Sequence, residues 1–403
     1  MKVAFFTHYP KLFGSNRALL ALMQGLKAFG VEPLVIIPGK GPMTDKLEAL
    51  GIPYLTCPFR LVFAKHPRAF DSAKRGWANF WLSLGMARRL RQLQVQAVYS
   101  NTIVIDFGFV LGRRLAVPHI WHIREFGDLD YGVRPIRGWH RLRRSLEESS
   151  AVITISKAIS SHWFADATVK NVHVIYDGVA LAADLDARLL AARKAFEAKD
   201  PRAPFRFVLV GLLQPAKGQQ TAIRALHLLR QAGTEARLVL VGSGDEGYVV
   251  KCKTLCAELG VADLVSFAGY VDNTLPFYLK ADAGLLCSRA EAYGLVTVEC
   301  MSCARPVIGH ATGATPELIA DGSNGLLYSG GAEQLAQCMR QLAENRPLAA
   351  SLGQNAWRRV KEELGIEQSI AKTLAILESV VSSAETGPHR EVAQVAVCQP
   401  ASN

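Results

Sequence analysis

Two glutamates eight positions apart are the clearest candidates for chemistry in this chain. Glu291 and Glu299 lie in the segment Ser-Arg-Ala-Glu-Ala-Tyr-Gly-Leu-Val-Thr-Val-Glu, which follows a buried-strand pattern from Ala283 to Cys287. A helical pattern begins after Gly294. This order predicts one carboxylate on a loop and the other about one turn into a helix, both at the carboxyl end of the strand.

Carboxylates in this arrangement can accept hydrogen bonds from sugar and ribose hydroxyls. The backbone N–H groups near Gly294, Leu295 and Val296 open the predicted helix and can receive a phosphate. A nucleotide sugar carries all of these groups. Surface glutamates at the same separation are also common without any function, so the pair alone leaves a structural interpretation open.

A second strand pattern places a cation near the same edge of a sheet. Phe207–Val210 ends at Gly211, and a loop then leads to Lys217-Gly218 at the start of another helical pattern. An ammonium beside a helix N-terminus favours a bound diphosphate. A solvated first-turn lysine is the alternative interpretation of Lys217.

Further blocks follow in order: the short strand pattern Pro306–Ile308, then 313–318 (Gly-Ala-Thr-Pro-Glu-Leu) and 321–327 (Asp-Gly-Ser-Asn-Gly-Leu-Leu). With the glutamate pair and the Gly-x5-Lys-Gly block, they resemble the retaining glycosyltransferases of the GT-B fold, specifically family four. The resemblance covers residues 1–375 and is sharper in the second half. It implies an α/β architecture of two Rossmann-like, doubly wound parallel-sheet domains that face a cleft.

The resemblance also implies roles for the residues of the second half. Glu299 would contact both ribose hydroxyls, and Glu291 the hydroxyls of the transferred sugar. Lys217 and the helix amides after Tyr293 would hold the diphosphate, so that preorganised dipoles meet the charge leaving the sugar. The donor would be a nucleotide-diphosphate sugar, with UDP favoured, and no cofactor is expected.

Three positions depart from the family pattern. Leu212 stands where the family usually has Arg after the strand-end glycine, which removes one of two cations expected to face the diphosphate. Ala304 and Ala314 replace glycines, which we interpret as modest packing changes.

Candidate residues of the first half lie at two strand ends. Gly14 and Ser15, in the loop 11–17, match the place where the resembled family brings a flexible loop over the donor phosphates. The loop lacks the Gly-x-Gly-x-x-Gly of a dinucleotide binder, which argues against a dehydrogenase. His122 ends a strand pattern where family members carry a functional His. A plain strand–helix turn and a structural histidine are the alternatives, and Arg124 and Glu125 are each other's expected partners.

No metal site is expected. Asp-x-Asp pairs occur at 128–130 and 184–186, but neither follows a strand of the nucleotide-binding half, where a cation would have to bridge the diphosphate. Cys300 and Cys303 lack companion ligands at zinc spacing. The resemblance therefore points to a metal-independent enzyme.

The length of 403 residues suits two domains. Strand patterns alternating with helices predict two parallel sheets; they cover Val3–Phe6, Leu34–Ile37, Ala97–Tyr99, His119–Ile123, Val152–Ile155, Val172–Ile175, and then Phe207–Val210, Leu238–Val241, Leu264–Phe267, Ala283–Cys287 and Pro306–Ile308. The predicted segments are an acceptor-side domain at 1–180, a linker helix at 181–204, a nucleotide-sugar-binding domain at 205–365, a helix at 366–381 that returns to the first domain, and a disordered tail at 382–403.

The charge of the chain is concentrated in one segment. Between Arg60 and Arg144 there are sixteen Lys or Arg against five acids, a difference of +11 that equals the net charge of the whole chain. Within this segment one helical face carries Trp77, Phe80, Trp81 and Leu84, and Arg88, Arg89 and Arg91 follow. Such a stripe can be core or membrane anchor, and the charge favours attraction to an anionic membrane or a lipid-diphosphate sugar. No nucleic-acid-binding motif accompanies it.

The sequence contains no apolar stretch of the roughly 18 to 20 residues that a spanning helix needs. The expected protein is therefore cytoplasmic and peripheral at the inner face of a membrane, extending a glycan or lipid-linked acceptor in surface polysaccharide or glycolipid biosynthesis. Two alternatives remain open: a GT-B epimerase acting on the nucleotide sugar, and a donor-binding subunit without turnover, which Leu212 would suggest.

Overall fold

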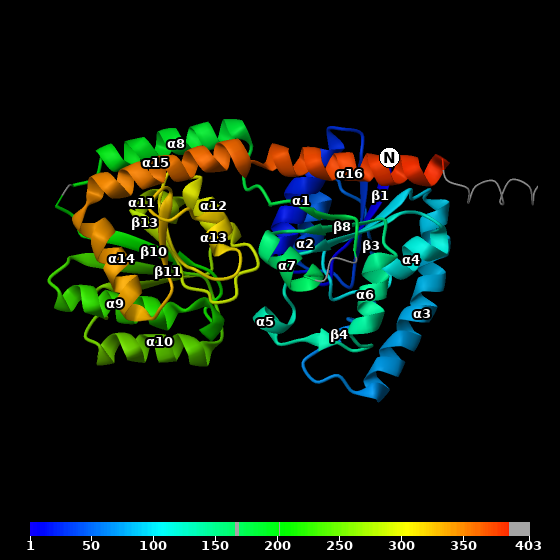
Figure 1. Cartoon of the computed structure of the whole chain (residues 1–403), viewed down its shortest axis with the longest axis horizontal. Helices are drawn as coiled ribbons and strands as arrows, with labels where there is room; N and C mark the ends of the chain where they lie inside the picture. The colour runs from blue at the N-terminus through cyan, green and yellow to red at the C-terminus, as the bar shows by residue number, and fades with distance from the viewer. Residues whose placement is uncertain (166–168, 201, 387–403) are drawn as a thin grey trace, which may run out of the picture. The chain divides into compact units, whose positions relative to one another are not determined.

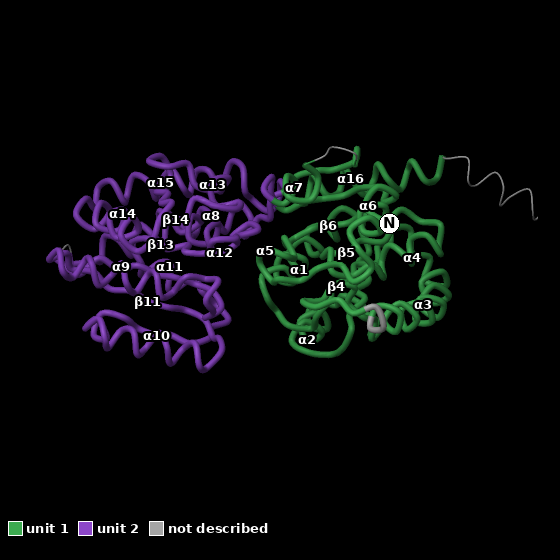
Figure 2. Tube along the Cα trace, turned by 60° about the horizontal axis from the view of Figure 1, so that its bottom comes forward, with its two compact units in different colours: residues 1–155, 159–175, 369–403 green, residues 156–158, 176–368 purple. Residues whose placement is uncertain are grey.

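The computed structural model describes residues 1–165, 169–200 and 202–386. The chain forms two compact units, coloured separately in Figure 2. Unit 1 contains Met1–Ile155, Ile159–Ile175 and the described residues from Ser369 onward. Unit 2 contains Ser156–Ala158 and Tyr176–Gln368.

The described part of unit 1 contains a seven-stranded sheet in the order β3-β2-β1-β5-β6-β8-β9, with every neighbouring pair parallel. Its strands are β1 (Lys2–Phe6), β2 (Glu32–Ile37), β3 (Tyr54–Thr56), β5 (Ala97–Ser100), β6 (His119–Ile123), β8 (Ala151–Thr154) and β9 (Val172–Val174). Helices cover parallel sheets on both faces, so their strands are apolar almost throughout. Strand β1 illustrates this, because Val3 to Phe6 are all fully buried.

The helices of unit 1 connect these strands (Figure 1). They are α1 (Gly14–Lys27), α2 (Pro42–Ala49), α3 (Ala69–Gln92), α4 (Phe107–Leu115), α5 (Asp128–Tyr131), α6 (Trp139–Glu147), most of α7 (Lys157–Phe164) and most of α16 (Ile366–Thr386). A small antiparallel pair, β4 (Phe63–Ala64) and β7 (Arg134–Pro135), lies apart from the main sheet. Helix α16 packs closely on α1, since a Cβ at Gly25 would lie 2.0 Å from Ile370 Cδ1.

Unit 2 contains, among its described residues, a six-stranded parallel sheet in the order β12-β11-β10-β13-β14-β15. The strands are β10 (Phe205–Val210), β11 (Ala236–Val241), β12 (Val265–Gly269), β13 (Ala283–Leu286), β14 (Val307–His310) and β15 (Gly325–Tyr328). The chain runs outward from β10 to β12 and then returns to place β13 on the other side of β10. Ligands of such sheets bind at the carboxyl ends of the strands where the order reverses, which here is between β10 and β13.

The helices of unit 2 are α8 (Ala182–Glu197), the 3-10 helix η1 (Pro215–Lys217), α9 (Gln219–Gln231), α10 (Glu246–Glu258), α11 (Leu275–Lys280), α12 (Leu295–Met301), α13 (Thr315–Leu318), α14 (Ala332–Glu344) and α15 (Arg346–Glu363). Helix α8 lies beside α15 and α9 beside α10, with the sheet between the two pairs (Figure 1). The loop before η1 follows β10, and α12 follows β13, so both approach the reversal point of the sheet.

The structure corrects several boundaries predicted from the sequence. Strands β3, β4, β7 and β15 were not predicted, and the linker helix ends at Glu197. The tail was predicted to be disordered from Ser382, which is wrong for 382–386 because α16 continues to Thr386. The remainder of that predicted tail, 387–403, lies outside the described residues.

Across residues 1–165, 169–200 and 202–386, no helix combines the length and the apolar content needed to span a bilayer.

Candidate functional site

The first candidate site lies in unit 2, where β10 and β13 end. Lys217 is the last residue of η1, and its Nζ donates to Glu291 Oε2 at 2.8 Å. The side chains retain 30% and 12% of their accessible surface, so the pair is largely withdrawn from water. The structure thus pairs two of the residues selected from the sequence. Lys217 follows β10, and Glu291 follows β13.

Gly218 allows this approach. It adopts φ +70°, and a Cβ at this position would lie 2.5 Å from the carbonyl oxygen of Cys287. Side chains other than glycine rarely adopt this backbone conformation. The glycine therefore lets the turn that carries Lys217 lie directly against the end of β13.

The loop that carries Glu291 is held by its own glycines. Gly294 adopts φ +92° and caps the N-terminus of α12, where Leu295 and Val296 form the first turn. Gly313 adopts φ +59°, and a Cβ there would meet the Glu291 carbonyl oxygen at 2.5 Å. Ala314 N donates to that same carbonyl at 2.9 Å. The start of the block 313–318 thus packs against the backbone of the Glu291 loop.

Glu299 lies on α12 and is oriented by two hydroxyl groups. Its Oε2 accepts from Tyr278 Oη at 3.1 Å and from Thr274 Oγ1 at 3.3 Å. Burial, and after it the Glu299 carboxylate, raise the pKa of Tyr278 well above its usual value, so the phenol stays protonated as a donor. Neither Thr274 nor Tyr278 was predicted, because nothing in their spacing connects them to the glutamate pair.

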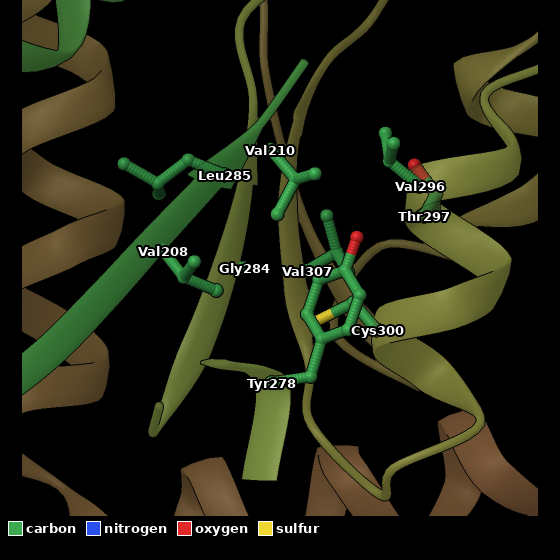
Figure 3. A pocket seen from close by; sticks show the side chains of 9 residues that line it. All are labelled: Val208, Val210, Tyr278, Gly284, Leu285, Val296, Thr297, Cys300 and Val307. Atoms are coloured by element: carbon green, nitrogen blue, oxygen red, sulfur yellow. The ribbon is translucent and has the colours of Figure 1, made fainter. Parts of the chain in front are cut away.

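A small cavity lies beneath α12, and Figure 3 shows the side chains around it. Its volume is about 10 Å³, and its lining includes Tyr278, Val296, Thr297 and Cys300. A space of this size holds at most about one water molecule. The cavity therefore belongs to the packing under the first turn of α12 and cannot receive a sugar.

Gly211 and Leu212 form the strand-end turn after β10. A Cβ at Gly242 would lie 2.0 Å from the Gly211 carbonyl oxygen, which shows how closely the two neighbouring turns approach. Gln219 Nε2 donates to the Leu212 carbonyl at 2.9 Å and holds the turn from the other side. The Leu212 side chain itself is 42% exposed. An apolar group therefore lies at the surface where the resembled family has a cation.

Glu317, within the 313–318 block, has a structural role. Its carboxylate accepts from the backbone N–H groups of Lys157 and Ala158, at 2.8 and 2.6 Å, and from Tyr176 Oη at 2.8 Å. All four residues belong to unit 2. The side chain caps the first turn of α7, as acidic side chains at helix N-termini commonly do.

The second candidate site lies in unit 1, at the end of β6. His122 Nδ1 lies 2.5 Å from Tyr99 Oη and 3.2 Å from Arg124 Nη2. Burial, and secondly the Arg124 charge, lower the pKa of His122 well below its usual value. Its Nε2 has no hydrogen-bond partner among the described residues. The ring is therefore neutral at physiological pH.

Arg124 links this histidine to the first loop. Its Nε donates to Asn101 Oδ1 at 2.6 Å, and Asn101 Nδ2 donates to the Ser15 carbonyl at 3.2 Å. Gly14 and Ser15 begin α1, and Asn16 Nδ2 anchors the preceding loop by donating to the Lys11 carbonyl at 2.7 Å. The structure thus connects His122 and Ser15, two of the unit 1 residues selected from the sequence, through one polar network.

Glu125 lies next to this network. It accepts from Thr102 Oγ1 and, at 2.8 Å, from the backbone N–H of Ile103. Burial raises the pKa of Glu125 to about 7, against the lowering effect of these hydrogen bonds. Arg124 and Glu125, which were expected to be each other's partners, thus also have other hydrogen-bond partners.

Asp130, from the first Asp-x-Asp pair, is hydrogen-bonded within its own loop. Asp130 accepts from the backbone N–H groups of Phe126 and Gly127, at 3.0 and 2.7 Å. In the described part of the chain, no three His, Cys, Asp or Glu side chains are grouped as metal ligands. Burial raises the pKa of the Cys57 and Cys303 thiols to about 11.

Two family models match this chain, one in each half. The family described as Glycosyl transferases group 1 matches residues 192–359, and the Glycosyl transferase 4-like domain matches residues 13–178. The chain belongs to the group 1 glycosyltransferases. The two matches together include both candidate sites and leave out mainly the end of the chain.

This chain matches only part of the length of its curated relatives. The D-inositol 3-phosphate glycosyltransferase of Acidothermus cellulolyticus is 37% identical over 132 residues, which cover 30% of this chain and 30% of that protein. The N-acetyl-alpha-D-glucosaminyl L-malate synthase of Bacillus anthracis is 32% identical over 154 residues, 38% of this chain and 40% of that protein. The matched segment therefore spans about a third of these relatives.

The fold itself is that of the GT-B glycosyltransferases. The crystal structure of Anabaena HepE in complex with UDP and glucose superposes with a TM-score of 0.75 at 20% sequence identity. The superposition covers 94% of this chain and 100% of that one. This group 1 glycosyltransferase thus has the α/β architecture that the sequence blocks predicted.

Proposed function

We propose that the protein is a retaining, metal-independent glycosyltransferase that moves a sugar from a nucleotide-diphosphate donor to a glycan or lipid-linked acceptor. UDP is the favoured nucleotide. The ion pair between Lys217 and Glu291, at the point where the strand order of unit 2 reverses, is the observation that carries this proposal. Sheets of this type bind their ligands at that point.

The pair lets one site hold opposite charges. An ammonium has three N–H donors, and Glu291 accepts one of them, so Lys217 can also donate to diphosphate oxygens. A carboxylate beside a diphosphate would otherwise repel it, and the adjacent ammonium offsets that repulsion. Glu291 can therefore remain an acceptor for hydroxyls of the transferred sugar.

Glu299 and the first turn of α12 complete the donor site in this proposal. Thr274 and Tyr278 orient the Glu299 carboxylate toward ribose hydroxyls. The first N–H groups of a helix lack intrahelical partners, and those at Leu295 and Val296 suit a phosphate. Together with Lys217 they would stabilise the charge that develops on the leaving diphosphate, so no acid is needed to protonate it.

The distribution of charge supports a place for this activity. The whole net charge of +11 is accounted for between Arg60 and Arg144, in unit 1, and not in the unit that carries the donor site. A lipid-linked acceptor at a negatively charged membrane would be attracted to such a unit. We therefore place the enzyme in the cytoplasm, at the inner face of a membrane, in surface polysaccharide or glycolipid biosynthesis, with no nucleic-acid partner.

The test is transfer from a panel of nucleotide sugars to glycan and lipid-linked acceptors, with mass spectrometry of the products. We expect a product with one of the donors, and NMR of its anomeric proton should show the configuration of that donor. An altered nucleotide sugar without acceptor would instead identify an epimerase. Donor binding with no product from any acceptor would identify a non-catalytic subunit, the role that Leu212 suggests.

A further inference from the structure

Helix α3 presents two different faces. It runs along the outside of unit 1 beside α4 (Figures 1 and 2). Asn79, Ser83, Met86 and Leu90 are buried on its inner face, and Asn79 exchanges hydrogen bonds with the backbone of Arg60 at 2.7 and 2.9 Å. The helix is thus firmly attached to unit 1 by its inner face, which is polar as well as apolar.

The outer face carries the larger apolar side chains. Trp77, Phe80 and Trp81 are 69%, 48% and 55% exposed, and we call these three residues the aromatic face. Their rings touch edge to face, with centroids 6.1 Å apart for Trp77–Trp81 and 5.6 Å for Phe80–Trp81. The sequence left open whether this stripe is core or surface, and the structure places it at the surface. Exposed apolar side chains gathered this way commonly mark an interaction site.

Basic side chains continue the aromatic face along the helix. No acid occurs from Ser72 to Gln92, and Arg88 and Arg91 follow Trp77 by eleven and fourteen residues, which places them on the same side of a helix. Both are exposed. From the neighbouring α4, the Arg114 guanidinium lies 4.8 Å from the centre of the Phe80 ring. The face therefore combines exposed aromatic rings with positive charge.

We propose that the aromatic face of α3 docks on an anionic lipid bilayer, a role that rests on the proposed transfer to a lipid-linked acceptor. Trp77, Phe80 and Trp81 would enter the boundary between headgroups and acyl chains, where amphipathic aromatic rings are favoured. Arg88 and Arg91 would contact lipid phosphates. A bilayer supplies the apolar region and the negative charge together, whereas a second copy of this face would bring like charges into contact.

Flotation with lipid vesicles tests this docking. Vesicles of phosphatidylcholine alone are compared with vesicles that contain about 30% phosphatidylglycerol, at low salt and at about 1 M salt, where the Debye length is only about 3 Å. The wild-type chain should float with the anionic vesicles and be released by salt. The double variant Trp77→Ser/Trp81→Ser should bind roughly tenfold more weakly, and Arg88→Gln/Arg91→Gln should lose the dependence on phosphatidylglycerol.

Phe29→Ser is the matched control, because Phe29 is 60% exposed in unit 1 but lies after α1, away from α3 in the sequence. It should float like the wild type, and all variants should keep their melting temperature, since the replaced side chains are at the surface. Wild-type protein that does not float at low salt, or a Trp double variant that floats unchanged, would overturn the proposal. A wild-type dimer that the Trp variant dissociates would overturn it too and assign the face to self-association.

Donor binding separates this proposal from the proposed function. Titration with UDP should give the same affinity for the wild type and the α3 variants, because none of the replaced side chains is among the residues proposed to hold the donor. Flotation without UDP binding would leave the docking surface standing and remove the donor site. UDP binding and transfer to a soluble acceptor without flotation would do the opposite.

Discussion

The Nδ1 atom of His122 lies 3.2 Å from a guanidinium nitrogen of Arg124. Guanidinium groups can only donate hydrogen bonds, so Nδ1 is an acceptor in this contact. The same atom lies 2.5 Å from Tyr99 Oη, which must then also donate to it. The ring proton of the neutral imidazole is therefore on Nε2. His122 presents a hydrogen-bond donor rather than a base, which suits a sugar hydroxyl or ring oxygen better than proton abstraction.

Tyr99→Phe should weaken this arrangement. Loss of one hydrogen bond of about 1 kcal/mol should lower the catalytic efficiency of sugar transfer by roughly three- to tenfold and add signal from the Nδ1–H tautomer. Nitrogen-15 NMR of the imidazole and transfer kinetics measure the two effects. Tyr54→Phe is the control, because the Tyr54 hydroxyl donates to Glu48 at an exposed site. An unchanged tautomer in Tyr99→Phe would show that Arg124 alone sets it.

Glu299→Gln should weaken donor binding. The amide would lose the proposed charge-assisted bonds to ribose hydroxyls, each worth roughly 1.5 to 3 kcal/mol, so calorimetry should show donor affinity at least about tenfold lower. Tyr278→Phe should show a smaller loss, because Thr274 still donates to the carboxylate. Glu333→Gln, at an exposed position of α14, is the control. A donor dissociation constant that does not change in Glu299→Gln would remove this residue from the site.

Lys217→Ala should impair turnover more than binding. In the proposed mechanism, with Leu212 in place of the usual cation, Lys217 carries the charge that stabilises the leaving diphosphate, and its loss should reduce turnover by roughly 100-fold or more. Lys217→Arg should recover part of the activity. Single-turnover kinetics at saturating donor provide the measurement. A change of only a few fold would mean that an arginine elsewhere supplies the charge.

Chelation should leave the reaction intact. Because we propose that Lys217 and the first turn of α12 stabilise the diphosphate, the enzyme should keep its activity after dialysis against EDTA. Initial rates before and after addition of magnesium or manganese decide the point. Full loss that a divalent cation restores would contradict the metal-independent mechanism.

Glu125 should make the stability of the protein depend on pH. Its pKa is raised to about 7 in the folded chain, above the ordinary value of 4.5, so between these values the folded state binds more protons than the unfolded state. The contribution of Glu125 to the free energy of unfolding should therefore be fully present below about pH 4.5 and should be lost as the pH rises to about 7. Glu125→Gln removes this dependence and should stabilise the chain at pH 8 by up to roughly 3 kcal/mol.

Urea unfolding at pH 5 and pH 8 measures this effect as the difference between wild type and variant. Gln can still accept from Thr102 and Ile103, so the local hydrogen bonds are preserved. A difference that does not vary with pH would show that Glu125 is ionised throughout this range.

The sheets could be predicted because strands buried on both faces appear in the sequence as continuous apolar runs. Strand β15 was not predicted because its residues, Gly-Leu-Leu-Tyr, follow directly on a turn-rich block. Strands β4 and β7 are only two residues long, too short for any period. The predicted end of helix α16 was too early, because the polar residues near the end of this helix resemble a disordered tail although they are helical.

The proposed donor site was predictable in part. Lys217 and Glu291 each follow a strand, but only the reversed strand order makes those strands neighbours, and a sequence does not contain that order. The hydroxyls that orient Glu299 come from Tyr278 of α11 and from Thr274, its N-cap residue, which precede β13 along the chain. The link from His122 to Arg124 depends on side-chain directions after β6, which spacing alone does not fix.

Reaction of the buried thiols would report the unfolding of the unit that contains them. Among the described residues, Cys57 is the cysteine of unit 1, while Cys252, Cys287 and Cys300 are among those of unit 2. Burial raises the pKa of these thiols, so little reactive thiolate exists while they remain enclosed. Alkylation followed by peptide mapping would therefore time the exposure of each unit separately, and would distinguish a unit that donor protects from one that it leaves unaffected.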